Sequence, residues 1–144
     1  MVDKTIKRNM VSQRAGSMLA IRQNRQEATP ADWEDLRKVL ASYREELDRT
    51  KFLVYTDGGT LTATQRKDLA QVLGDAHARV AVVSDSVKVR FAGVTISLFQ
   101  KNYRQFTTDE LHEAYQHLDL TATEQRQVAH VLKTLEEIVY PDGK

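Results

Sequence analysis

The sequence predicts an α/β fold: a single domain with a mixed, partly parallel sheet of four to five strands, helices packed on it, and an extra C-terminal helix. Residues 52–55 and 80–83 are short and continuously apolar, which is typical of strands covered on both faces. Segments with helical periodicity alternate with these runs, and such alternation indicates crossover connections between parallel strands. The 144 residues contain no repeat, linker or low-complexity stretch, so residues 1–144 are expected to form one domain.

Helix starts are marked by a recurring pattern, a threonine followed three residues later by Glu or Gln. In this capping box the threonine hydroxyl accepts a hydrogen bond from a backbone N–H, and the later side chain reaches back to the threonine's own N–H. The pattern occurs at Thr62, Thr107 and Thr121. Thr29 marks a fourth start, because Pro30 follows it at the first helical position, where its missing N–H costs nothing. Apolar residues recur at helical spacing after each start. Together with the apolar segment that follows Ser86, these signals predict helices at about 30–48, 63–73, 87–100, 108–118 and 122–139.

The chain before the first helix is expected to form a β-hairpin over about residues 5–23. Its arms are 5–13 and 18–23, and the connecting residues 15–17 include a glycine, which suits a tight turn. A last short strand is expected at 103–106. The predicted order is of the ββαβαβαα type, to which residues 103–106 add a last strand in the five-stranded form of the sheet.

Composition argues against several classes of function. The chain has no cysteine, which excludes disulfides and thiolate metal sites. No apolar run approaches the ~18 residues of a membrane span and the N-terminus lacks a signal peptide's apolar core, so we expect a cytoplasmic protein. The basic first segment, which includes Arg22, has no interleaved aromatic residues. It is interpreted as a solvated face of edge strands, and no nucleic acid is expected as a partner. His112 and His117 are five residues apart on one helix, a poor spacing for a shared metal, so neither a metal nor another cofactor is expected.

Residues 54–60, Val-Tyr-Thr-Asp-Gly-Gly-Thr, invite comparison with two classes of enzyme. In ribonuclease H-like nucleases a strand ending Tyr-Thr-Asp-Gly carries the first metal-binding carboxylate. Here no Glu lies between Asp57 and Asp85, and two-metal chemistry needs several converging carboxylates. In haloacid-dehalogenase-type phosphatases carboxylates would stand where this chain has Thr56 and Gly58. We therefore expect no enzymatic activity.

Asp57, Gly58 and Gly59 are interpreted instead as a structural turn. Glycine permits the positive φ that such a turn needs where a strand leads into a capped helix. A glycine-containing loop at a helix N-terminus can also hold an anion. These three residues are therefore the candidate ligand loop of a small-ligand sensor.

Ser84, Asp85 and Ser86 follow the second apolar run and precede a segment that is apolar on almost every side of a helix. In one interpretation this helix is buried between the sheet and the C-terminal helices, and a serine caps its first turn. In the other, one face covers the sheet while the opposite face meets a protein partner or a second copy of the chain. Ser86 and Ser84 are then candidate phosphorylation sites. The candidate interaction residues are Ser84, Asp85, Ser86, Val89, Arg90 and Phe91.

With Ser84-Asp85-Ser86 between an apolar strand and an apolar helix, the order of elements over roughly residues 18–139 resembles the STAS-like domains, a superfamily that includes anti-sigma-factor antagonists, and most closely a small bacterial branch of it. In the antagonists, a serine at the start of the helix after a central strand is phosphorylated and controls binding to a partner kinase. They usually carry Asp-Ser followed closely by Gly-Leu, whereas Ser86 is followed by Val-Lys. The residues that carry the resemblance are Val83 to Ser86, Val89-Arg90, Ile96 to Phe99, Phe106, and Asp109-Glu110-Leu111 through Leu118.

The resemblance implies a non-enzymatic protein–protein interaction or regulatory module in bacterial cytoplasmic signalling, acting on a protein partner or through self-association. The alternative is a small-ligand, nucleotide or lipid sensor. Such a sensor would use the loops at the carboxyl ends of the strands, where open α/β sheets bind ligands.

Overall fold

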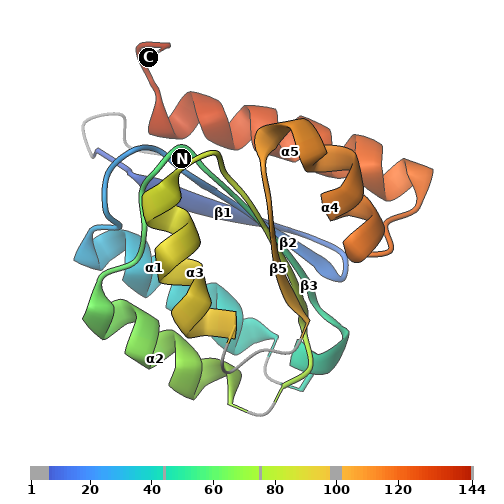
Figure 1. Ribbon diagram of the computed structural model, residues 1–144, viewed down its shortest axis with the longest axis horizontal. Helices are drawn as coiled ribbons and strands as arrows, with labels where there is room; N and C mark the ends of the chain where they lie inside the picture. Colours follow the sequence, from blue (N-terminus) through green and yellow to red (C-terminus); the bar gives the residue numbers. More distant parts are fainter. Residues whose placement is uncertain (1–6, 44, 75, 98–101, 144) are drawn as a thin grey trace.

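A five-stranded sheet in the order β1-β2-β3-β4-β5 lies at the centre of the computed structural model, which describes residues 7–43, 45–74, 76–97 and 102–143 (Figure 1). β1 is antiparallel to β2, and the remaining neighbours are parallel. The predicted mixed, partly parallel α/β fold is thus confirmed. The strands are β1 (Met10–Ala15), β2 (Met18–Gln23), β3 (Lys51–Thr56), β4 (Arg79–Val83) and β5 (Tyr103–Phe106).

The hairpin between β1 and β2 forms as expected, with Ala15 paired to Met18 and Gly16 at a φ of 62° in the turn. β1 begins later than predicted, at Met10. The regular ladder ends there because the Asn9 N–H donates to the Asp32 carboxylate at the start of the first helix, although the Asn9 carbonyl still accepts from the Asn24 N–H at 2.9 Å. Residues 5 and 6 of the predicted strand lie outside the described residues.

The helices divide between the two faces of the sheet (Figure 1). The three crossover helices lie on one face, and the two final helices cover the other. Successive strand residues point to opposite faces, so Phe52 and Val80 belong to one core while Leu53 and Ala81 belong to the other. This explains the continuous apolar runs of β3 and β4. The helices are α1 (Pro30–Ser42), α2 (Ala63–Leu73), α3 (Val87–Ser97), α4 (Leu111–His117) and α5 (Ala122–Val139).

The capping boxes predicted at Thr62 and Thr121 form in full, and α2 and α5 have the expected bounds. At Thr107 the Glu110 carboxylate accepts from the Thr107 N–H, and the predicted start at Thr29 also has a capping box, with Asp32. α1 is shorter than predicted: it ends at Ser42, not near residue 48. Its continuation stops because the buried Tyr43 hydroxyl donates to the Met18 carbonyl of β2, and a separate 3₁₀ turn follows at Leu47–Arg49.

α4 is also shorter than predicted, because Thr108–Glu110 forms a 3₁₀ turn before it. α3 lies on the face of α1 and α2, so it is not enclosed between the sheet and the C-terminal helices (Figure 1). Residues 98–100 of its predicted span lie outside the described residues. Within the described part of the chain, no helix combines the length and apolarity needed to cross a membrane.

Candidate functional site

A polar cleft of about 680 Å³ opens at the carboxyl ends of β2, β3 and β4. We call it the strand-end cleft. It brings together the loop after β3 and the loop after β4, as the sequence predicts for neighbouring parallel strands. The end of α5 and the residues that follow it complete its wall. Its main side chains come from Arg22, Tyr55, Asp57, Asp85, Ser86, Thr108, Glu136 and Tyr140.

Arg22 is the charged centre of this cleft. Strand alternation places it on the same face as Met18 and Ala20, so it faces α5, and its side chain is only 4% exposed. One guanidinium nitrogen, Nη2, lies 2.9 Å from an oxygen of Asp57 and 2.9 Å from an oxygen of Glu136. Arg22 is therefore not on a solvated face of an edge strand; that interpretation is wrong because two carboxylates compensate its charge inside the fold.

Electrostatics around Arg22 hold the guanidinium charged. Burial lowers the pKa of Arg22, but the hydrogen bonds and charges of Asp57 and Glu136 outweigh it, and the net pKa lies above the ordinary value. The guanidinium also stacks over the Tyr55 ring at 4.6 Å from the ring centre. Cation–π contacts of this kind add attraction without using a hydrogen-bond donor.

Tyr140, just beyond α5, closes the cleft by donating its hydroxyl hydrogen to Asp57 Oδ2 at 2.6 Å. Burial, and then the hydrogen bond and charge of Asp57, raise the pKa of Tyr140 to about 12. The phenol therefore stays protonated at neutral pH and donates to a carboxylate that Arg22 also contacts. Arg22, Asp57, Glu136 and Tyr140 form one network, which ties α5 to the sheet.

The loop of Asp57, Gly58 and Gly59 has the structural role predicted for it, with one difference between its glycines. Gly58 has a φ of 140°, which favours glycine, as expected. Gly59 is required for space instead, because a Cβ there would lie 2.1 Å from the Gln26 carbonyl oxygen. The N–H groups of all three loop residues donate within the protein, to Gln23, Thr56 and Asn24 in turn, so the loop presents no free amide to an anion.

Ser84, Asp85 and Ser86 fasten the start of α3. The Ser84 hydroxyl is buried and accepts from the Ser86 N–H at 3.1 Å, and the Ser86 hydroxyl accepts from the Val89 N–H at 3.4 Å. The exposed Asp85 carboxylate accepts from both the N–H and the hydroxyl of Thr108, at 2.9 and 2.7 Å. These bonds, the backbone one first, lower the pKa of Asp85. Of the two serines, only the partly buried Ser86 lines the cleft.

The start of α3 presents apolar side chains to solvent on its outer face. Phe91 is 73% exposed and Val87 is 60% exposed, and among the described residues they are the exposed large hydrophobic side chains. Residues four apart share a helix face, which joins the two into one patch. Val89 points the other way, is 6% exposed and packs in the core, so its assignment to the interaction surface is wrong.

Three members of the network, Arg22, Glu136 and Tyr140, were not predicted as site residues from the sequence. Of these, only Arg22 has a sequence pattern that could have identified it. Arg22 is the single charged residue of β2, at a position that alternation assigns to a buried face. Glu136 lies on the exposed face of α5 and Tyr140 follows the helix end, so neither stands out locally. The lining of the cleft contains no histidine, and no cluster of metal-ligating side chains occurs within the described ranges.

No family model, curated protein or solved structure matches this chain.

Proposed function

We propose that this protein is a non-enzymatic interaction module that binds a protein partner through the outer face of α3, formed by Val87, Arg90 and Phe91. The observation that carries the proposal is the exposure of Val87 and Phe91, because large hydrophobic side chains that share one exposed face mark recognition sites. Arg90 is also exposed, and arginine and aromatic residues dominate binding energy at interfaces.

The hydrogen bonds at the start of α3 support this proposal. Ser84 and Ser86 close the turn that leads into the helix, and Asp85 joins that turn to Thr108 after β5. The patch is thereby held in a fixed orientation, which reduces the entropy lost on binding. The residues of the turn also lie beside the patch, so a phosphate on Ser86 would change its charge.

Charge indicates the chemistry of the partner. Val87 and Phe91 are flanked by the exposed cations Lys88 and Arg90, and α3 contains no acidic residue. A complementary surface therefore has an apolar pocket with an acidic rim. The resemblance of residues 83–90 to STAS-like domains supports a role for such a partner in bacterial cytoplasmic signalling.

The alternative of a ligand sensor at the strand-end loops receives less support from the geometry. The amides of residues 57–59 are engaged, and Arg22 already contacts two carboxylates. A nucleotide phosphate would have to displace these partners to reach Arg22.

Site-specific photo-crosslinking tests the docking surface. A benzophenone amino acid is placed at position 91 in cells, and at the exposed Ala129 of α5 as a matched control. The expected result is a crosslinked protein specific to position 91. After its purification, calorimetry should show that Phe91→Asp weakens its affinity at least about thirtyfold, as for a buried aromatic anchor, while Ala129→Asp has no effect.

Two results would overturn the docking surface: identical crosslinks from both positions, or an affinity that Phe91→Asp leaves unchanged. If position 91 crosslinks to a second copy of the chain and the protein dimerises in solution, the surface serves self-association and not a separate partner. Because Phe91 is exposed, we expect its substitution to leave the melting temperature unchanged, which is checked by circular dichroism.

A further inference from the structure

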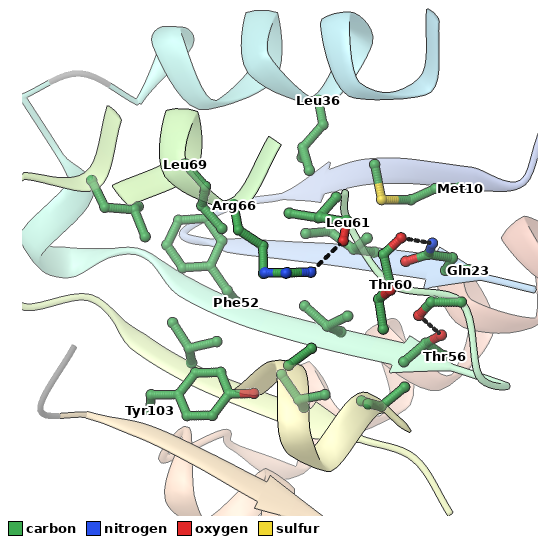
Figure 2. Close-up of a pocket in the computed structure, with 18 of the residues that line it drawn as sticks. Met10, Gln23, Leu36, Phe52, Thr56, Thr60, Leu61, Arg66, Leu69 and Tyr103 are labelled. Carbon is green, nitrogen blue, oxygen red and sulfur yellow. Dashed lines mark hydrogen bonds between the residues drawn. The ribbon is translucent and has the colours of Figure 1, made fainter. Parts of the chain in front are cut away.

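An apolar cavity of about 110 Å³ lies between the sheet and the layer of crossover helices, distinct from the strand-end cleft (Figure 2). Side chains of β2, β3 and β4 form its floor, among them Ile21, Phe52, Val54 and Val82. α1, α2 and α3 contribute its walls. Leu61 and Leu69 at its edge are only partly buried, so the cavity reaches solvent beside α2.

The uncharged polar side chains of this cavity already have partners within the protein, and the Tyr103 hydroxyl accepts from the Gln105 amide at 3.0 Å. The Gln23 amide nitrogen donates to the Thr60 carbonyl at 3.1 Å, and the Thr56 hydroxyl donates to the Gly59 carbonyl at 2.7 Å. None of these groups needs a ligand. An occupant therefore meets apolar walls and a single charged side chain, that of Arg66.

Arg66 extends from α2 across the cavity, where its Nη1 donates to the Leu61 carbonyl at 2.7 Å (Figure 2). Within the parts of the chain that the structure describes, no carboxylate forms an ion pair with it, although Arg37 and Asp68 pair nearby. Arg66 is also the fourth residue of α2, where the positive end of the helix dipole disfavours a cation. A partly buried, uncompensated charge against apolar walls is costly.

We infer that the cavity binds a small monocarboxylate with an apolar ring or short chain, its carboxylate paired with Arg66 and its apolar part against β2, β3 and β4. The guanidinium fork matches a carboxylate and has donors left after its bond to Leu61. The volume of about 110 Å³ is smaller than the ~150 Å³ of an apolar cavity that holds benzene, so it takes only the ring of benzoate or the chain of hexanoate, with the carboxylate at Arg66, and excludes a long fatty acid or a nucleotide. This site is independent of the docking surface on the outer face of α3.

Calorimetry and thermal shift with benzoate and hexanoate test the site, with benzyl alcohol as the uncharged comparison. We expect saturable binding of at least one acid below about 10 mM. Arg66→Gln should weaken it at least about tenfold, because the carboxylate loses its counter-charge. Lys67→Gln removes an exposed neighbouring cation outside the cavity and should change affinity less than about twofold.

A second variant fills the cavity without touching Arg66. Ala92 of α3 lines it, and Ala92→Leu should abolish binding of the acids while keeping the protein folded. Methyl NMR shifts should map to Val54 and Val82 and leave Val87 unmoved. Binding that survives both Arg66→Gln and Ala92→Leu, an equal loss in Lys67→Gln, or no binding of either acid at about 10 mM overturns the inference.

Discussion

Replacing Arg22 by methionine tests whether the buried guanidinium holds the C-terminal helix to the sheet. The side chain is 4% exposed and makes charged hydrogen bonds to Asp57 and Glu136. A hydrogen bond to a charged group contributes about 1.5–3 kcal/mol, and orphaning a buried charge costs about 3–5 kcal/mol. The carboxylates are 27% and 53% exposed, so water can solvate them after the loss. The expected cost of Arg22→Met is therefore about 2–3 kcal/mol.

Urea denaturation followed by circular dichroism measures this cost. With an m-value of about 2 kcal/mol/M for a chain of this size, the midpoint should fall by about 1–1.5 M. Double-mutant cycles separate the contributions of the Arg22–Asp57 and Arg22–Glu136 ion pairs. Arg22→Met with Asp57→Asn should show a coupling of at least about 1 kcal/mol, and Arg22→Met with Glu136→Gln less than about 0.5 kcal/mol, because Glu136 is half exposed. Additive losses in the Asp57 cycle would refute the reasoning.

Three further predictions concern the same end of the sheet. Ultraviolet titration should show one phenol with a pKa of about 12 that is missing in Tyr140→Phe and is lowered in Asp57→Asn. Because the pKa is raised on folding, the stability from the neutral phenol is complete below about pH 10 and is lost as the pH rises toward 12. If the free energy of unfolding of Tyr140→Phe runs parallel to that of wild type over this pH range, the assignment is contradicted. Gly59→Ala should lower the free energy of unfolding by about 3 kcal/mol in urea denaturation, since its Cβ would meet a backbone carbonyl. Gly16→Ala, at a positive φ but in open space, should lower it by about 1 kcal/mol. Equal losses would show that the loop moves aside freely. The lowered pKa of Asp85 adds stability above about pH 3.8 that disappears as the pH falls. The difference in free energy of unfolding between wild type and Asp85→Asn should therefore become smaller in acid. A difference that stays constant with pH would exclude the carboxylate as its source.

The sequence predicted those parts of the fold that local chemistry decides. Three capping boxes fix the starts of α1, α2 and α5 because donor and acceptor lie within one turn. Apolar runs identify β3 and β4 because both of their faces are covered. The end of α1 is different. It depends on Tyr43 reaching the Met18 carbonyl 25 residues earlier, and no window of sequence around Ser42 contains that partner.

The candidate site was predicted in part for the same reason. The loops after β3 and β4 could be paired in advance, because parallel neighbours end at one edge of the sheet. The position of α3 could not, since a segment apolar on almost every side does not show which face is covered. The Tyr140–Asp57 hydrogen bond joins residues 83 apart, and only the packing of α5 brings them together.

The placement of α5 has a consequence for synthesis. It covers the sheet face that carries Met18, Ala20 and Leu53, yet it is translated after every strand. Until α5 leaves the ribosome, the part of that apolar face over β1 and β2 is open, and exposed surfaces of this kind draw chains into aggregates or onto chaperones. A chain that ends before residue 122 would keep α4 against β4 and β5 but would leave Met18 and Ala20 without the helix that buries them.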